Sequence, residues 1–329
     1  AKDWFVEMAK RLFDDSTGLL IVNEETGYVT IDQRCTSIHS ESEAHRLFRA
    51  VGTFIAKAVM DGQTLGIKVD PLLLCHMVGK VPSLDSFDPT AEDGIGNVGC
   101  MNGLSILAVT EPQFYKGLKW VQENDVEGAD LTFTCSYELF DESQIVELVP
   151  LGGQLMVDNK NKFEYVRLMT KWLLKDRYEP ALTDVLEGFS NHVQVSKMKF
   201  FSIKELELLI TGVPDIDVNE LKANAQFGGF VSQSDQVLWL FAMLEELDHE
   251  KLGKFLQFVS GCPCLPVDGL KPPLLVTLME EISTSADSTL PRSHTCFNQI
   301  VIPRYSSLEV MKKQIVYALE NAAEGFFIS

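Results

Sequence analysis

A cysteine lies in a polar, proline-bounded stretch near the end of the 329-residue chain, within LPRSHTCFNQIVIP at residues 290–303. Its neighbours there are His294, Thr295 and Asn298. Buried cysteines usually pack among hydrophobic residues, whereas a thiol among imidazole, hydroxyl and amide groups is a candidate nucleophile. An unperturbed thiol is already about a few per cent thiolate at neutral pH, so Cys296 could exchange with a thioester after little activation.

The spacing of His294 and Cys296 suggests how the two side chains could cooperate. One residue separates them, and in an extended segment residues two apart point to the same side. The imidazole could then raise the thiolate fraction of Cys296. A solvated histidine beside a cysteine without a chemical role fits the same spacing, so both interpretations stay open.

Other arrangements of cysteine and histidine predict less. The pair Cys262 and Cys264 could serve as a metal or redox pair, but the sequence has no CxxC and no HExxH, and a zinc site needs about four ligands. We therefore expect no metal and no cofactor. A cysteine protease remains an alternative, because its base is normally a histidine remote in sequence. The candidates lie in or near helical patterns: His39, His45, His76, His192 and His249.

Periodic patterns indicate the elements that must position these residues. Apolar residues at helical spacing predict a long helix over 41–60, and residues 19–31 predict a hairpin. Residues 85–111, rich in Gly, Asp, Asn and Pro, predict a long loop. Short β-like runs flank Cys296, at residues 273–278 and 298–303.

The C-terminal segment and one internal break complete the pattern. Ser306 and Glu309 form a capping-box pattern that predicts the start of a final helix, and Gly325 is expected to end it. The stretch TGVPDID at residues 211–217 is a short Gly-Pro break, which is typical of a hinge between two bodies.

Charge and composition exclude several classes of function. The chain has 28 Lys and Arg against 47 Asp and Glu, a formal charge of -19, so it is expected to bind neither nucleic acid nor an anionic membrane. Its longest apolar stretches fall short of the roughly 18 residues that span a bilayer. Seven scattered cysteines, an odd number, favour a reducing compartment, and we expect the cytoplasm or nucleus.

Taken together, residues 290–327 resemble the C-terminal end of a HECT-type ubiquitin ligase. The resemblance rests on LPRSHTCFN, the following PRYSS, the capped helix and the terminal Gly-Phe. Further segments resemble the family in the expected order, so that nearly the whole chain is covered: FRAVGTFIAKAVMDGQ, YKGLKWVQENDVEGADLTF, VDNKNKFEYVRLMTKW, ELELLITGVPDIDV and FLQFVSGCPCLP.

The resemblance implies an α+β, two-lobed fold. A larger, mostly helical N-lobe would occupy residues 1–211, a hinge residues 212–214 (Gly212, Val213 and Pro214), and a smaller α/β C-lobe residues 215–329. Cys296 would accept ubiquitin as a thioester and pass it to a substrate lysine. His294 and Thr295 would shape the loop, Asn298 would fix it, and Phe326 would position the C-lobe for transfer.

The resemblance also implies partners: a ubiquitin-conjugating enzyme, ubiquitin and a protein substrate. The groove for the conjugating enzyme would be lined by Phe114, Leu118, Leu131 and Tyr165, although ordinary core packing is an equal alternative for Leu118 and Leu131. Met60 stands where many members have an aromatic residue that contacts a second ubiquitin. The family usually begins some tens of residues before the equivalent of Trp4, so an N-terminally truncated N-lobe is expected. The alternative function is an inactive HECT-like module that only binds conjugating enzyme or ubiquitin.

Overall fold

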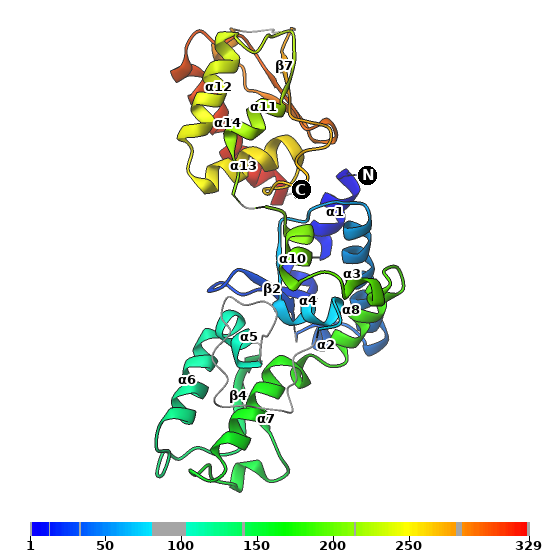
Figure 1. The fold of residues 1–329 in the computed structure, drawn as a ribbon, viewed down its shortest axis with the longest axis vertical. Helices are drawn as coiled ribbons and strands as arrows, with labels where there is room; N and C mark the ends of the chain where they lie inside the picture. Colours follow the sequence, from blue (N-terminus) through cyan, green and yellow to red (C-terminus); the bar gives the residue numbers. More distant parts are fainter. Residues whose placement is uncertain are drawn as a thin grey trace. The chain divides into compact units, whose positions relative to one another are not determined.

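The chain folds as two compact units, seen in a computed structural model (Figure 1). The structure describes residues 2–12, 14–32, 34–80, 103–139, 142–213, 215–280 and 285–327. The larger unit comprises Leu12–Met60 and Ile67–Glu207. The smaller unit comprises Ala1–Arg11, Asp61–Gly66 and Leu208–Ser329. The mixture of helices and sheets confirms the predicted α+β class, while the predicted lobe boundaries at residues 211 and 215 stay a prediction.

Helices dominate the larger unit, and two small sheets lie among them. The helices are α2 (Cys35–Ile38), α3 (Glu41–Met60), α4 (Pro71–Met77), α5 (Gly103–Thr110), α6 (Pro112–Glu123), α7 (Lys162–Leu174), α8 (Ala181–Ser190) and α9 (Val195–Met198). Short 3-10 turns are η1 (Asp15–Thr17), η2 (Gly152–Gln154) and η3 (Asp176–Tyr178). One sheet has the order β1 (Leu20–Val22), β2 (Tyr28–Ile31), β3 (Lys68–Val69), and the other is the hairpin β4 (Thr134–Leu139) with β5 (Glu142–Glu147).

The smaller unit is built on a four-stranded sheet. Its strand order is β6 (Gln226–Gly228), β7 (Leu275–Leu278), β9 (Gln299–Ile302), β8 (Arg292–His294). β6, β7 and β9 are parallel, and β8 runs antiparallel to β9. The helices are α11 (Val218–Asn224), α12 (Asp235–Glu246), α13 (His249–Ser260) and α14 (Leu308–Phe327), with 3-10 turns η4 (Ala286–Ser288) and η5 (Thr295–Phe297). Two helices cross the unit boundaries in sequence: α1 (Lys2–Leu12) and α10 (Ile203–Thr211).

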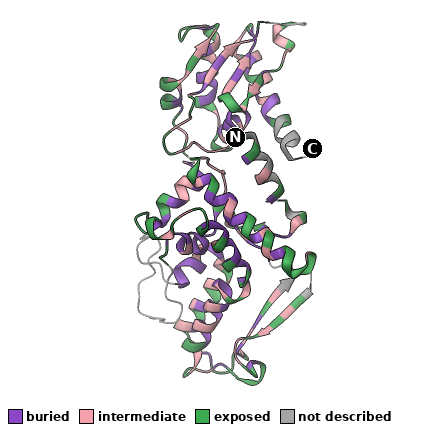
Figure 2. Cartoon of the chain, turned by 90° about the vertical axis from the view of Figure 1, so that its right-hand side faces the viewer, coloured by how far each residue is buried: buried purple, intermediate pink, exposed green. Residues whose placement is uncertain are grey.

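Buried apolar side chains unite the sheet and helices of the smaller unit. Ile300 and Ile302 on β9 are fully buried and share one core with Phe241 of α12, Phe255 of α13 and Ile315 of α14. Figure 2 shows buried residues along the helices of both units. Val276 of β7 belongs to the same core, so β7 and β9 are both part of one packed body.

Most predicted elements agree with the structure. The long helix is confirmed as α3 (Glu41–Met60), and the hairpin as β1 and β2. The predicted strands beside Cys296 are confirmed as β7 and β9.

Three expectations are wrong in detail. Residues 103–110 form α5 rather than loop, because the apolar run LSILAVT is buried and a short apolar run has no periodicity to reveal a helix. At the start of α14, Ser307 accepts the Val310 N–H at 3.3 Å, whereas Ser306 binds Asp287 instead. α14 continues past Gly325 to Phe327, since glycine permits but does not force the turn that ends a helix.

The crossing of α3 and α8 depends on two glycines. A β-carbon on Gly52 would lie 1.9 Å from the Val185 carbonyl oxygen, and one on Gly188 would lie 2.0 Å from that of Arg49. Real β-carbons do not approach backbone so closely, so the helices can meet at this distance only where both residues lack a side chain. The Thr53 hydroxyl, which donates to the Gly188 carbonyl at 3.3 Å, adds a bond across the contact.

We expect Gly52→Ala and Gly188→Ala each to lower the free energy of unfolding by about 3 kcal/mol, because the backbones must move apart. Urea unfolding followed by circular dichroism measures the change. Gly117→Ala is the matched control, since Gly117 lies in α6 and a β-carbon added there would meet no atom within 4 Å. It should raise stability by about 0.5 to 1 kcal/mol. Similar effects of all three substitutions would show that the close approach does not matter.

Candidate active site

Cys296 lies at the tip of a hairpin. Strand β8 ends at His294, β9 begins at Gln299, and the 3-10 turn η5 joins them. The antiparallel register pairs His294 with Gln299 and Arg292 with Val301. Cys296 is exposed and present as a thiol rather than in a disulfide. The hairpin thus presents a nucleophilic atom to solvent on a rigid base.

Asn298 fixes this turn through hydrogen bonds to residues 272 and 275. Its backbone adopts the left-handed conformation, with φ 49° and ψ 47°, and its side chain is fully buried. The Nδ2 group donates to the Pro272 carbonyl at 2.5 Å, while the Asn298 carbonyl accepts from the Leu275 N–H at 3.0 Å. Asparagine tolerates this conformation better than most residues. The amide therefore ties the turn that carries Cys296 to the chain entering β7.

The segment that leads into β8 is fixed by buried Tyr305. Its hydroxyl donates to the Thr289 carbonyl at 2.9 Å, and burial raises the pKa of the phenol, which keeps it a donor. Nearby, the Asp287 carboxylate accepts from the backbone and hydroxyl of Ser306 at 2.8 and 2.6 Å, which lowers the pKa of Asp287. The segment that enters β8 is thus anchored at two residues to the segment before α14.

Burial separates Cys296 from cysteines of the larger unit. Cys35, Cys75 and Cys135 are buried, and desolvation raises their pKa values to about 11, 12 and 11. At neutral pH a thiol with so high a pKa is almost entirely protonated, which disfavours these residues as nucleophiles. Cys262 and Cys264 are half-buried. Cys296 is the exposed cysteine in the described part of the chain.

The expected same-side placement of His294 and Cys296 assumed an extended segment, and that assumption is wrong. Residues 295–297 form a 3-10 turn, so the alternation of an extended strand stops at His294. His294 is exposed at the end of β8, and Thr295 begins the turn, where its carbonyl accepts from the Asn298 N–H at 3.2 Å. Phe326 lies in the last turn of α14, and its side chain is outside the described residues.

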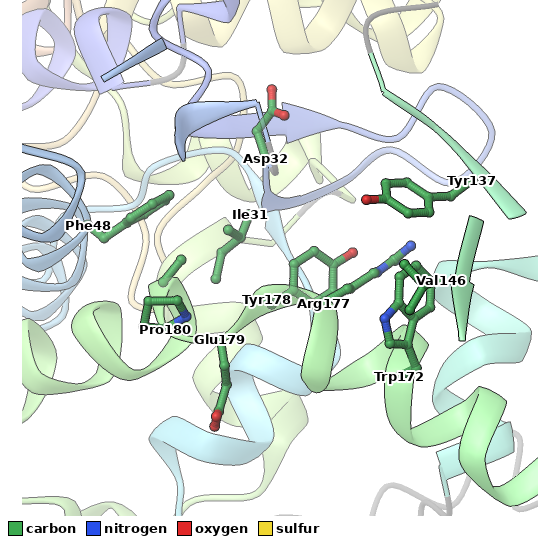
Figure 3. Close-up of a pocket in the computed structure, with 11 residues that line it drawn as sticks. Ile31, Asp32, Phe48, Tyr137, Val146, Trp172, Arg177, Tyr178, Glu179 and Pro180 are labelled. Atoms are coloured by element: carbon green, nitrogen blue, oxygen red, sulfur yellow. The ribbon is translucent and has the colours of Figure 1, made fainter. Parts of the chain in front are cut away.

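The larger unit contains a pocket of about 240 Å³ lined by Tyr137, Trp172 and the segment from Arg177 to Ala181 (Figure 3). Arg177 is ion-paired with Glu111 and lies over the rings of Trp172 and Tyr178. Burial raises the pKa of Tyr178 to about 12, so its phenol is neutral at physiological pH. Among the described residues that line the pocket there is no cysteine or histidine, so they offer no thiol or imidazole as a nucleophile or base.

The predicted docking residues lie in the larger unit with different burial. Leu118 of α6 and Tyr165 of α7 are buried, and the Tyr165 ring packs edge-on against Phe133 at 5.6 Å. Phe114 and Leu131 are half-buried. Leu118 and Tyr165 therefore contribute to the core of this unit, and a docking role for any of the four stays a prediction.

Sequence reasoning missed a set of exposed apolar residues beside Leu131. The Leu131 carbonyl accepts from the Val157 N–H at 2.8 Å, and the Phe133 N–H donates to the Leu155 carbonyl at 3.2 Å, so residues 151–157 run alongside 131–133. The exposed apolar residues of this segment and the start of α7 are Leu151, Leu155, Met156 and Phe163. Leucine, methionine and phenylalanine in a turn-rich segment were the available sequence signal.

The predicted hinge residues are tightly packed within the smaller unit. Gly212 has φ 88°, and a β-carbon there would lie 2.7 Å from the Leu265 carbonyl oxygen. Val213 and Leu265 exchange two backbone hydrogen bonds, at 2.7 and 3.2 Å. Pro214 lies outside the described residues. Motion at these residues stays a prediction.

Two further expectations concern metals and membranes. Among the described residues, no group of three or more His, Cys, Asp or Glu side chains could hold a metal ion. Nor does that part of the chain contain a helix with the length and hydropathy of a membrane span.

Met60, at the position where many family members have an aromatic residue that contacts a second ubiquitin, is exposed at the end of α3. Binding of a second ubiquitin there stays a prediction.

Comparison with known proteins places these features in a family. The family model described as HECT-domain (ubiquitin-transferase) matches residues 6–329. The chain is 30% identical over 338 residues to the E3 ubiquitin-protein ligase UPL1 of Arabidopsis thaliana and 29% identical over 334 residues to HUWE1 of Mus musculus. It is 27% identical over 330 residues to ptr1 of Schizosaccharomyces pombe. These alignments cover 99% of the chain but only 8%, 7% and 10% of the relatives.

We expect Asn298→Ala to lower the free energy of unfolding of the smaller unit by about 2 to 3 kcal/mol, since it removes the bond to Pro272 and strains the left-handed backbone. Asn298→Gly loses only the bond and should cost about 1 kcal/mol. Urea unfolding monitored by tryptophan fluorescence gives both values. Equal losses in the two variants would contradict a role for the left-handed backbone.

Proposed function

Because this chain belongs to the HECT-domain family of ubiquitin transferases, we propose that it accepts ubiquitin as a thioester on Cys296 and transfers it to a lysine of a protein substrate. The single observation that carries this assignment is the exposure of Cys296 on an anchored hairpin tip. The buried cysteines of the larger unit are disfavoured by their raised pKa values.

The proposed reaction consists of two acyl transfers. The Cys296 thiolate attacks the thioester carbonyl that joins ubiquitin to a conjugating enzyme, and the tetrahedral intermediate collapses with release of that enzyme's cysteine thiolate. A lysine amine of the substrate then attacks the Cys296 thioester, loses a proton, and displaces the Cys296 thiolate as the amide bond forms. Each step breaks one acyl–sulfur bond. The first step forms a new acyl–sulfur bond, and the second forms an acyl–nitrogen bond.

Positioning is expected to dominate the rate of the first step. Transfer of an acyl group from one thiol to another is nearly isoergic, so a strong general base is unnecessary. Correct placement of the reacting atoms then supplies most of the acceleration. In this chain Asn298 and Tyr305 act as positioning residues, because they fix the turn and the approach to β8. His294 and Thr295 shape the surface beside the thiol.

The partners follow from the proposed reaction: a ubiquitin-conjugating enzyme, ubiquitin and a substrate protein. We place the reaction in the cytoplasm or nucleus, which the thiol state of the described cysteines supports. The formal charge of -19 disfavours nucleic acid as a partner.

We assign docking of the conjugating enzyme to an apolar surface of the larger unit. The docking surface consists of half-buried Leu131 and Phe114 together with exposed Leu151, Leu155, Met156 and Phe163. Exposed apolar groups gathered on one segment are typical of protein–protein contacts. Leu118 and Tyr165 are buried and belong to the core of the same unit.

The proposed thioester can be detected directly. After brief incubation with activating enzyme, ATP, a conjugating enzyme and labelled ubiquitin, the chain should carry an adduct on a non-reducing gel that dithiothreitol removes. Cys296→Ala should carry none. Cys296→Ser should carry an ester that resists thiols, because an oxygen ester exchanges with thiols far more slowly than a thioester.

The outcomes separate the competing functions. An adduct retained in Cys296→Ala would assign the thioester to another residue. Binding of conjugating enzyme by a folded chain that never forms an adduct would favour the inactive module. Hydrolysis of ubiquitin esters without transfer to lysine would favour a cysteine hydrolase.

Two substitutions in the docking surface test its role. Leu155→Ser with Met156→Ser should slow the loading of Cys296 by about tenfold at subsaturating conjugating enzyme, since buried interface anchors contribute about 1 to 2 kcal/mol. Thermal unfolding should be unchanged, because both side chains are exposed. Val231→Ser, at an exposed apolar site of the smaller unit, is the matched control and should load normally. Normal loading of the double variant would contradict this surface.

A further inference from the structure

Two cysteines one residue apart, Cys262 and Cys264, take no part in the proposed reaction. They follow α13, whose C-cap residue Gly261 adopts the left-handed conformation, and the chain bends at Pro263 and Cys264. Both are half-buried. Small reagents can therefore reach this pair more readily than the fully buried cysteines of the larger unit.

One face of this bend packs against residues 64–66. The Thr64 hydroxyl donates to the Cys262 sulfur at 3.3 Å. A β-carbon on Gly66 would lie 2.7 Å from Pro263 Cδ and 3.3 Å from the Cys262 sulfur. Gly66 has φ 67°, so the close contact and the backbone conformation both require glycine there.

The same bend packs against the predicted hinge. A β-carbon on Gly212 would lie 2.8 Å from Cys264 Cβ and 3.3 Å from Thr64 Cγ2. Val213 follows Gly212, and Leu265 follows Cys264. These two residues are joined by two backbone hydrogen bonds. Movement of the Cys264 side chain must therefore displace residues 212–213.

The covalent geometry allows the two thiols to be joined. Residues two apart have α-carbons at most about 7 Å apart, and a bend brings them closer. Disulfides span α-carbon separations of about 4.4 to 6.8 Å. Thr64 contacts the Cys262 sulfur and, like the β-carbon of Cys264, lies beside Gly212, so the Cys262 sulfur and the Cys264 β-carbon both lie in the same small region.

We propose that Cys262 and Cys264 are a redox modification site that closes reversibly to a disulfide in reaction with a low-molecular-weight disulfide such as oxidised glutathione. One protein thiolate attacks a glutathione sulfur, forms a mixed disulfide and releases one glutathione thiolate. The second protein thiolate then displaces the other glutathione. Two protein thiols are oxidised, one glutathione disulfide is reduced to two thiols, and the protons pass through solvent. Closure of the ring stiffens the segment 212–213.

Mass spectrometry of the Cys296→Ala chain tests closure without any ubiquitin chemistry. After incubation with oxidised glutathione and blocking of remaining thiols with N-ethylmaleimide, the peptide containing both cysteines should carry no label and weigh two hydrogens less than its reduced form. Dithiothreitol should restore two labelled thiols. The single variants Cys262→Ser and Cys264→Ser should instead keep one glutathione adduct. A parent peptide bearing only glutathione adducts or only N-ethylmaleimide would overturn the proposal.

Hydrogen exchange on the same samples tests the effect on the hinge segment. Oxidation should slow exchange of the Val213 and Leu265 amides, whereas the double variant Cys262→Ser with Cys264→Ser should be insensitive to oxidant. Unchanged exchange in a chain shown to contain the disulfide would overturn the coupling.

A final arm rests on the proposed function and is separable from the other two. The chain is charged with ubiquitin so that Cys296 is protected, and is then treated with diamide, which accepts two electrons and two protons and releases no thiol. Discharge to free lysine should slow by roughly two- to tenfold, as when a conformational step limits turnover, and should be unchanged in the double serine variant. Equal discharge rates before and after oxidation of the parent chain would overturn the effect on transfer.

Discussion

The buried amide of Asn298 is the constraint on which the hairpin that carries Cys296 depends. A sharp turn between β8 and β9 needs one residue in the left-handed conformation, and this residue is asparagine, held by the Pro272 carbonyl. The parallel pairing of β7 with β9 continues the same attachment, because the Asn298 carbonyl accepts the Leu275 N–H. A flexible turn would carry the thiol through many orientations. Because the base of the turn is fixed in a packed sheet, the Cys296 sulfur is exposed and still confined to few orientations.

Burial differentiates chemically identical side chains in this protein. Cys35, Cys75 and Cys135 lie in the larger unit, where desolvation raises their pKa values and makes them small hydrophobic side chains. Cys296 stands in solvent on the smaller unit, and this exposure is why we propose it as the residue that forms the thioester. Cys262 and Cys264 are intermediate in exposure, which suits reversible modification better than either catalysis or core packing.

The larger unit obtains its rigidity in a different way. Its longest helix, α3, meets α8 through Gly52 and Gly188, so the two backbones approach more closely than any side chain would allow. In the same unit, Leu118 of α6 and Tyr165 of α7 are buried. Apolar side chains of the segment 151–156 are exposed. A rigid helical base with an exposed apolar surface is a suitable platform for a protein partner.

The sequence by itself determined the family, the α+β class, the long helix of the larger unit and two strands of the smaller unit, and it singled out Cys296 as the proposed nucleophile. These rest on local signals: an ordered motif around Cys296, helical spacing over 41–60, and β-branched runs at 275–278 and 299–302. Only the tertiary structure decided that Leu118 and Tyr165 are core, that Ser307 caps α14, and that α5 is a helix. It also decided that Asn298 bonds to Pro272, 26 residues away. Burial and long-range hydrogen bonds depend on which segments meet in space, and the spacing of residues along one segment carries no record of that meeting.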